Sequence, residues 1–506
     1  MTAPDWLEPL YDAAGMAGMD RWAIDERDVP SLELMEVAGA ALARETELAA
    51  RPGPIRIVAG KGNNGGDGMV AARLLGAAGH EVEVLSIWPL DELSPDSTAN
   101  LGRLASGVAR VVAEDGWAAA LAGSGAIVDA IFGTGFEGAP RGAAKTAIEA
   151  IDDAGAPVVA CDVASGVDAS NGEVAGAAVS ADATVTFHVA KIGHRIAPGK
   201  AHTGRLVVAP IGIPEGAPGE PAAGTITDAV LDLQPRRGAE STKFSSGDVL
   251  VVGGSRGLTG APCMAARAAI RAGAGYATVA CPADLEPILE VKLTEVMTIG
   301  LEQVGHGLGA GAAAPVLERA ERSACVVLGP GLGRSDESLA LARDLAPRIP
   351  VPLLIDADGL NALGTDLALL RARTAPTVLT PHAGELGRLL GCDSEDISAH
   401  RLARARRASA DSGAVVVLKG DDTIVADGER VAVNALDSPG LATAGTGDVL
   451  SGTIGALIAR GLEPFAAACA GVRANTRAGR LAAERVGAES VIAGDVIESL
   501  PGGLAR

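Results

Sequence analysis

Two stretches of this sequence combine glycines with polar side chains, as loops that bind ligands do. The first is the segment 60–68 (GKGNNGGDG), which follows the apolar run 55–60. Glycines permit left-handed backbone angles and a close approach to a ligand, and a helix starting here would point free N–H groups at an anion. A plain strand-to-helix turn would need only the glycines. The added oxygens of Asn63, Asn64 and Asp67 favour a binding loop.

Two further polar groups follow other apolar runs of the first half. They lie in the segments 129–139 (DAIFGTGFEGA) and 161–168 (CDVASGVD). The carboxyl ends of parallel strands meet at one edge of a sheet, so we expect both groups beside the glycine loop. One such aspartate is often only a helix cap. Asp129 and Asp162 together with an asparagine and a serine, but no His or Cys, are typical of a hard-cation site rather than a zinc site.

The second stretch is Gly445-Thr446-Gly447-Asp448, at the start of an apolar helical run. Its N–H groups would form an anion site, and Asp448 could take a proton from an attacking hydroxyl. By itself the motif also fits a capping aspartate after a flexible turn. The segments 419–423 (KGDDT), 380–385 (TPHAGE) and 329–333 (GPGLG) each end a predicted strand and strengthen the case for a site.

The elements that must position these groups are short apolar runs separated by helical stretches. In the first half the runs are 55–60, 82–87, 126–133, 157–163 and 183–189, with helical stretches at 14–50, 66–78 and 141–154; in the second half they are 248–254, 276–281, 325–331, 352–358, 377–381 and 414–420. Runs of this length without in–out alternation indicate parallel sheets covered on both faces. We predict an α/β protein of two consecutive doubly wound domains, 1–225 and 241–506, with a linker at 226–240 in a stretch rich in Pro, Gly and polar residues.

Composition narrows the function classes. The chain has 506 residues and a formal net charge of −21, which argues against nonspecific binding to nucleic acid or to an anionic membrane. Six scattered cysteines without a CxxC pair predict reduced thiols, and neither a signal peptide nor a transmembrane run is recognisable. We therefore expect a cytoplasmic homo-oligomer whose partners are small molecules, with no nucleic acid and no membrane.

A resemblance adds to this reading. KGNNGGDG, VDAIFGTG and DVASGVD resemble the epimerase domain of NAD(P)H-hydrate repair enzymes, over nearly all of residues 10–214. VLGPGLG, IDADGLNAL, LTPHAGELGRLLG, VVLKGDDT and SPGLATAGTGDVLSG resemble the ribokinase-like ADP-dependent NAD(P)H-hydrate dehydratases, over roughly residues 240–480. The resemblance implies a Rossmann-like epimerase domain followed by a ribokinase-like domain. The implied activity is epimerisation of R and S hydrates and ADP-dependent dehydration of the S form to NAD(P)H, with release of AMP and phosphate.

The resemblance also implies roles for individual residues. The hydrated dinucleotide would contact Asn63, Asn64, Gly65, Gly66, Asp67, Gly133, Thr134, Gly135, Phe136, Glu137, Gly138 and Ala139, with the catalytic Asp162 facing the ring and K⁺ on Asn64, Asp129 and Ser165. In the second domain the substrate would contact Ala261, Gly331, His382, Ala383, Gly384, Glu385, Leu386, Gly387 and Arg388, with Asp448 as catalytic base. The nucleotide, ADP with Mg²⁺, would contact Lys419, Gly420, Asp421, Asp422, Thr423, Ser438, Pro439, Gly440, Leu441, Ala442, Thr443, Ala444, Gly445, Thr446 and Gly447.

Two positions depart from the family pattern, and two other functions stay open. Ala164 stands where the family usually has Pro, and Asn475 where we would expect His. From the residues alone, His382 reads as an ordinary core or capping histidine. The alternatives are a ribokinase-like kinase of a vitamin precursor with an N-terminal accessory domain, and a first domain that serves as a ligand sensor or interaction module.

Overall fold

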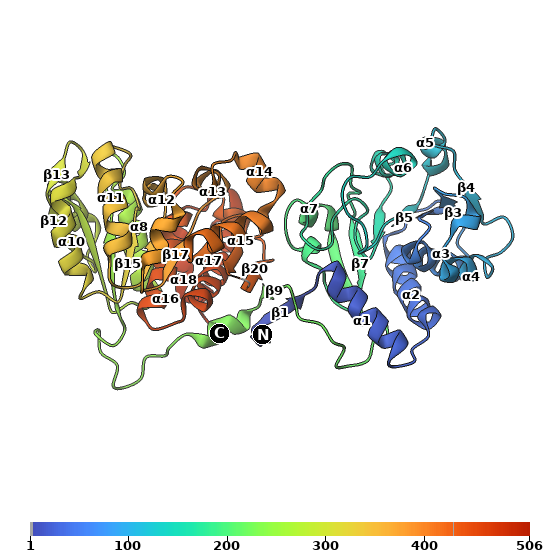
Figure 1. Ribbon diagram of the computed structural model, residues 1–506, viewed down its shortest axis with the longest axis horizontal. Helices are drawn as coiled ribbons and strands as arrows, with labels where there is room; N and C mark the ends of the chain where they lie inside the picture. The colour runs from blue at the N-terminus through green and yellow to red at the C-terminus, as the bar shows by residue number, and fades with distance from the viewer. Residues whose placement is uncertain (1–3, 429) are drawn as a thin grey trace. The chain divides into compact units, whose positions relative to one another are not determined.

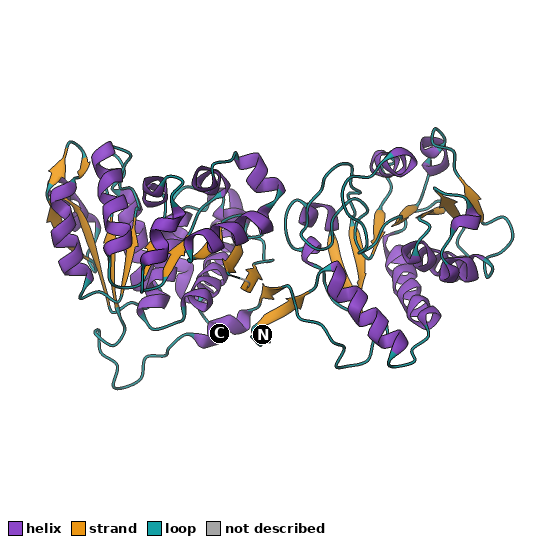
Figure 2. Cartoon of the chain, viewed as in Figure 1, coloured by secondary structure: helices purple, strands orange, loops and turns teal. Residues whose placement is uncertain are grey.

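The computed structural model describes residues 4–428 and 430–506, which form two compact units. One unit spans Pro9–Ala223, and the other combines Pro4–Glu8 with Gly224–Arg506. Each unit contains its own large sheet with helices packed against it (Figure 1), and the same alternation of helix and strand runs through both (Figure 2). The predicted class, two consecutive α/β domains, is confirmed.

The sheet of the first unit is entirely parallel, in the order β4-β3-β2-β5-β6-β7-β8. Its strands are β2 (Ile55–Ala59), β3 (Val82–Ser86), β4 (Ala109–Val111), β5 (Ala126–Ala130), β6 (Val158–Cys161), β7 (Ala183–Phe187) and β8 (Arg205–Ala209). The strand order reverses between β2 and β5. Ligands of doubly wound sheets bind at such a switch point, where the loops after the two strands diverge.

Helices cover both faces of this sheet. Within β2, Ile57 packs with residues of α1 (Ala13–Asp25), α2 (Ser31–Ala49) and α3 (Asn63–Ala77), whereas Val58 packs with α5 (Trp117–Leu121) and α6 (Gly142–Asp153). The helical stretch expected at 14–50 is two helices, because Pro30 caps α2 in an extended conformation and the residue before a proline disfavours helix. Two short helices, α4 (Pro95–Leu101) and α7 (Gly199–Thr203), complete the unit.

The second unit is built on a mixed sheet in the order β1-β9-β20-β19-β18-β17-β16-β15-β10-β11-β12. The strands are β1 (Leu7–Leu10), β9 (Ala223–Ile226), β10 (Asp248–Val252), β11 (Tyr276–Pro282), β12 (Met297–Leu301), β15 (Cys325–Leu328), β16 (Leu353–Ile355), β17 (Thr377–Leu379), β18 (Val415–Leu418), β19 (Ile424–Asp427) and β20 (Arg430–Val433). All six strands expected in this half are present. The antiparallel β18, β19 and β20 extend the parallel part, and a separate hairpin joins β13 (Gln303–Val304) to β14 (Gly307–Leu308).

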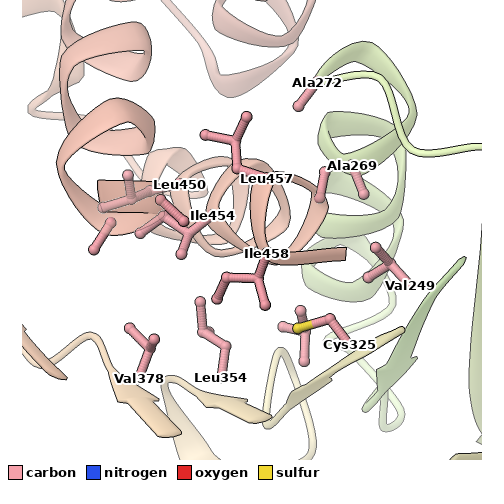
Figure 3. Packing of buried hydrophobic residues seen from close by; sticks show 14 of the residues in the cluster. Val249, Ala269, Ala272, Cys325, Leu354, Val378, Leu450, Ile454, Leu457 and Ile458 are labelled. Atoms are coloured by element: carbon pink, nitrogen blue, oxygen red, sulfur yellow. The ribbon is translucent and has the colours of Figure 1, made fainter. Parts of the chain in front are cut away.

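The helices of the second unit are α8 (Gly260–Arg271), α9 (Glu286–Lys292), α10 (Ala313–Ala320), α11 (Asp336–Arg348), α12 (Asp358–Leu363), α13 (Ala383–Leu390), α14 (Ser394–Ala399), α15 (Arg401–Ser412), α16 (Thr446–Ala459), α17 (Pro464–Val486) and α18 (Ala493–Gly503). Helix α16 is central to the core: Leu450, Ile454 and Ile458 pack with residues of β10, β15, β16, β17 and α8 (Figure 3). A Cβ at Gly452 would lie 1.9 Å from the carbonyl oxygen of Ala265 in α8, so the two helices approach closely. This packing fixes the start of α16, which carries the GTGD motif.

The whole of the expected linker, residues 226–240, belongs to the second unit. Strand β9 pairs with β20, and the 3-10 helix η3 (Asp228–Leu233) buries Val230 and Leu231. Residues 4–8, expected in the first domain, belong there too: the Trp6 ring centroid lies 6.0 Å from that of Phe465, and the backbone N–H of Thr227 donates to the carbonyl of Trp6. Backbone pairing at a sheet edge depends little on side-chain pattern, so the sequence held no clear signal for it.

No helix in the described ranges is long and apolar enough to cross a membrane. All six cysteines are free thiols, and five of them are buried. Burial raises the pKa of Cys281 and Cys325 to about 12, so these thiols stay protonated and unreactive.

Candidate active sites in the two units

The first unit contains a cavity of about 670 Å³ lined by loops that follow β2 and β5 and by the residue that follows β6. Many of the residues predicted to contact the dinucleotide line this cavity. They are Asn63, Asn64, Asp67, Gly133, Thr134, Gly135, Phe136, Glu137 and Asp162. The predicted Gly65, Gly66, Gly138 and Ala139 are not among its lining residues. A Cβ at Gly65 would lie 2.1 Å from the Gly60 carbonyl oxygen, and one at Gly66 2.7 Å from the Met35 sulfur. These two glycines therefore let α3 pack, while the asparagines and Asp67 face the ligand space.

Asp162 is held in a left-handed backbone conformation, with φ of 66°. The backbone N–H of Asp162 donates to the Val185 carbonyl oxygen. Nε2 of His194 lies 2.8 Å from the carbonyl oxygen of Asp162. Oδ1 accepts hydrogen bonds from Lys191 Nζ at 2.6 Å and Thr186 Oγ1 at 3.0 Å. A strained residue pinned on several sides is common at functional sites.

The charges around this cavity shift the pKa values of its carboxyl groups in opposite directions. Burial alone would raise the pKa of Asp162, but the charge and hydrogen bond of Lys191, helped by the hydrogen bond of Thr186, outweigh it and lower the pKa below its usual value. Burial, with the charge of Asp162, raises the pKa of Asp67 well above its usual value. Burial also lowers the pKa of His194 to about 3, so this ring is neutral.

The residues predicted to bind K⁺ lie together beneath the loop after β5. Asp129 is fully buried; its Oδ1 accepts from Ser165 Oγ at 2.6 Å and its Oδ2 from the Ser165 N–H at 2.8 Å. Asn64 Nδ2 donates to the Phe132 carbonyl at 2.9 Å, and the Phe132 N–H donates to Ser165 Oγ. Among the described residues no basic side chain pairs with Asp129. The cluster is thus a set of oxygen ligands around an uncompensated carboxyl group.

The second unit contains a cavity of about 630 Å³ beside the start of α16. The predicted nucleotide residues that line it are Lys419, Gly420, Asp421, Thr423, Ser438, Pro439, Leu441, Ala442, Thr446 and Gly447. The predicted Asp422, Gly440, Thr443, Ala444 and Gly445 are not among its lining residues. Asn475 also lines the cavity, and no hydrogen-bond donor within the described chain reaches its buried Oδ1.

Lys419 is the cationic centre of this site. Its Nζ lies 2.9 Å from Asp356 Oδ1 and 3.7 Å from Glu385 Oε2, and a Cβ at Gly447 would lie 3.5 Å from it. Burial opposes protonation of Lys419, but the nearby carboxylates prevail and raise its pKa. The ammonium therefore lies charged beside the GTGD turn.

Asp448 follows Gly447 on α16, and its pKa suits a general base. Burial, reinforced by Asp356, raises its pKa to about 7, while Lys419 opposes the shift. No group in the described ranges donates a hydrogen bond to its carboxylate. A general base works best when its pKa is near the working pH.

The carboxylate of Asp422 is paired with a buried arginine rather than lining the cavity. Its carboxylate is fully buried and paired with the Arg401 guanidinium, at 2.8 Å from Nε and 2.7 Å from a terminal nitrogen. The same guanidinium donates to the Lys419 carbonyl oxygen at 3.3 Å. The pair therefore holds the turn 419–423 in place.

His382 caps helix α13, which is the role that its residue type alone suggests. Its Nδ1 accepts from the N–H groups of Gly384 and Glu385, while Glu385 Oε2 accepts from the His382 N–H. Ala261 and Gly331, also predicted to contact substrate, lie close together: a Cβ at Gly331 would be 3.2 Å from that of Ala261.

Several side chains at these sites were not predicted from the sequence. They are Asp20, Thr186, Lys191 and His194 in the first unit and Arg334, Asp356, Asp358 and Arg401 in the second. One weak signal existed for Lys191, which stands two residues after a predicted buried strand. Another existed for Asp356 and Asp358, which end a predicted strand within IDADGLNAL.

Comparison with known proteins decides the family. Residues 249–502 match the NAD(P)H-hydrate dehydratase family, and residues 31–193 match the YjeF-related protein N-terminus. The bifunctional NAD(P)H-hydrate repair enzyme Nnr of Moorella thermoacetica is 41% identical, covering 97% of this chain and 96% of the relative. The protein of the same name from Coxiella burnetii is 35% identical, covering 97% and 98%. The chain belongs to the bifunctional NAD(P)H-hydrate repair enzymes.

Membership in this family confirms the predicted activity, a bifunctional epimerase and ADP-dependent dehydratase. The solved structures that are similar to parts of the chain include the following two. The ADP/ATP-dependent NAD(P)H-hydrate dehydratase of Bacillus subtilis, co-crystallised with ATP and Mg²⁺, is 26% identical over 55% of this chain and 96% of its own, with a TM-score of 0.48. A yeast protein is 24% identical over 39% and 86%, with a TM-score of 0.34.

Proposed function

We propose that the first cavity is the epimerase site and that the second cavity holds ADP for the dehydratase. The observation that supports this division best is the contrast between two aspartates. Asp162 in the first unit is bound to an ammonium group and has a lowered pKa, whereas Asp448 in the second has a pKa raised to about 7 and no bound donor. On this proposal each of the two compact units carries one activity, and the boundary between the units lies near Ala223.

In the epimerase site, Asp162 would move the proton of the hydroxyl on carbon 6 of the hydrated nicotinamide ring. The dinucleotide would lie along the polar residues of the loops after β2 and β5. Asn63, Asn64 and Asp67 offer amide and carboxyl groups, and the loop 133–137 lines the same cavity. Polar groups that converge in a largely apolar cavity fix the orientation of a ligand.

The first unit suits a monovalent cation such as K⁺. Asn64, Asp129 and Ser165 would hold it, and the buried carboxyl of Asp129, paired with no basic side chain in the described ranges, supports that assignment. Oxygen ligands with a single carboxylate match a weakly charged, hard ion. When bound, the ion would supply positive charge for the substrate phosphates and would order the loop after β5.

In the dehydratase, Asp448 would accept the proton of the carbon-6 hydroxyl as its oxygen attacks the β-phosphorus of ADP. AMP leaves, and the phosphorylated substrate then loses phosphate and a proton from carbon 5, which restores NAD(P)H. Lys419 and the N–H groups at the start of α16 would stabilise the phosphoryl oxygens. Arg401 would keep Lys419 in place through the turn it supports.

Mg²⁺ would enter the second site with the nucleotide. The described residues contain no group of three His, Cys, Asp or Glu side chains that could hold a metal ion by themselves. Mg²⁺ commonly binds through one or two carboxylates together with substrate phosphates, which fits this site. The bound ion would supply further charge to the phosphoryl oxygens.

The test is incubation of the full chain with a mixture of R and S hydrates and ADP, followed by the recovery of reduced-cofactor absorbance. We expect complete conversion of both epimers with one AMP and one phosphate released per cofactor. Recovery that stops when the S form is consumed would contradict the epimerase assignment, and accumulation of a phosphorylated product would contradict the dehydratase assignment. A cytoplasmic location stays a proposal supported by the six free thiols, and the homo-oligomer stays a prediction.

A further inference from the structure

The ammonium group of Lys191 has no proton left for a ligand. Its Nζ donates to Asp162 Oδ1 at 2.6 Å, to Thr186 Oγ1 at 2.7 Å and to the Phe187 carbonyl oxygen at 3.0 Å. An ammonium group carries three N–H donors, and all three are used. With a side chain 1% exposed, Lys191 lines the epimerase cavity as a fixed positive charge rather than as a proton donor.

The two oxygens of the Asp162 carboxylate differ in their hydrogen bonding. Oδ1 takes both hydrogen bonds, from Lys191 and Thr186. Oδ2 receives no hydrogen bond from any group within residues 4–428 and 430–506. The two hydrogen bonds to Oδ1 hold the carboxylate in this orientation, and the backbone of Asp162 is fixed at its N–H and its carbonyl oxygen. Oδ2 is therefore the atom left to meet a substrate.

Asp162 itself is a carboxylate, because the charge and hydrogen bond of Lys191 outweigh its burial and lower its pKa. The groups that interact with it are Asp20 of α1, Asp67 of α3, Cys161 of β6, and Lys191 and His194 around the 3-10 helix η2 (Ile192–His194). His194 is neutral, and Lys191 keeps its protons in hydrogen bonds. Asp162 thus meets the substrate as a carboxylate. An acid that expels the hydroxyl as water would need a proton at the start, which Asp162 lacks.

We propose that Lys191 is a positioning residue that keeps Asp162 a base, and that the epimerase inverts carbon 6 by opening the ring at the C6–N1 bond instead of by expelling water. This inference rests on the proposed function of the first cavity.

The proposed steps balance without an added reactant. Oδ2 takes the hydroxyl proton, the O–H electron pair forms the C6=O bond, and the C6–N1 pair moves to N1. The charge on N1 is delocalised through C2=C3 into the carboxamide, and Oδ2 returns the proton to N1. Rotation about C5–C6 presents the other face of the aldehyde, and the reverse steps close the ring with inverted configuration. The hydroxyl oxygen is retained throughout.

The test follows that oxygen. The full chain is incubated without ADP with the pure R hydrate in water enriched in oxygen-18, and the S hydrate formed is analysed by mass spectrometry. We expect the S hydrate to keep its original oxygen. One solvent oxygen gained per inversion would overturn the inference and point to water loss, with the protonated Asp67 as acid. No interconversion at all would instead refute the proposed epimerase site.

A variant pair tests Lys191 itself. Lys191→Met should move the acidic limb of the epimerisation pH profile up by roughly one to three pH units, because an opposite charge lowers an aspartate pKa by that amount. Lys191→Arg should restore much of the profile. Lys145→Met is the matched control on the exposed surface of the same unit and should leave it unchanged. A Lys191→Met profile identical to that of the natural chain would overturn the positioning role, and the oxygen test stands if this variant fails to fold.

Discussion

Asp356 joins Lys419 to the helix that carries Asp448. Its Oδ1 lies 2.9 Å from Lys419 Nζ, and its Oδ2 accepts a hydrogen bond from Ser451, which is three residues after Asp448 on α16. The nucleotide turn and the proposed base are therefore fixed by opposite oxygens of one buried carboxylate.

Asp448→Asn should reduce dehydration of the S hydrate about 100-fold or more, the range expected for a positioned general base. ADP affinity should change little, because Lys419 and the N–H groups of α16 make the proposed phosphate contacts. Turnover at saturating ADP and calorimetric ADP affinity are the measurements. Turnover within a few-fold of the natural chain would contradict the role of Asp448.

The dehydration rate should rise with pH through about 7, because Asp448 has a pKa raised to about 7 and acts only when ionised. Asp356→Asn removes a negative charge that contributes to this raised pKa. The acidic limb of the pH profile of the dehydration rate should therefore move to lower pH in the variant. A limb that stays in place or moves upward would show that another group controls it.

Asp162→Asn should abolish most interconversion of R and S hydrates, because an amide cannot take up the hydroxyl proton. Dehydration of pure S hydrate by the same preparation should be unchanged and serves as the internal control. The two rates are measured separately, by chromatography of the epimers and by cofactor absorbance. Near-normal interconversion would exclude Asp162 as the acid–base group.

Arg401→Ala should destabilise the second unit by about 3 to 5 kcal/mol, since it leaves the fully buried Asp422 without its partner. The free energy of unfolding is measured from denaturant curves. Arg407→Ala on the same helix removes a solvent-exposed pair with Asp411 and should have little effect. Equal stability of the two variants would contradict the structural role given to Arg401.

Trp6→Ala should destabilise the dehydratase unit by about 3 to 5 kcal/mol, the usual loss for a buried tryptophan. Epimerase activity after mild heating should survive, because residues 4–8 belong to the other unit. Leu48→Ala, at an exposed position, is the control. Loss of epimerase activity before dehydratase activity would show that residues 4–8 stabilise the first unit instead.

The sequence by itself determined the two α/β domains, the loops at the strand ends and the two aspartates. These features are local: buried parallel strands need continuous apolar runs, and Gly65 is required by the carbonyl oxygen of Gly60 in the same loop. The tertiary structure alone decided how the charges pair. Lys191 and Asp162 are 29 residues apart, and Arg401 and Asp422 are 21 apart. Which buried charge meets which is set by packing over such separations, so a sequence shows the charges but not their partners.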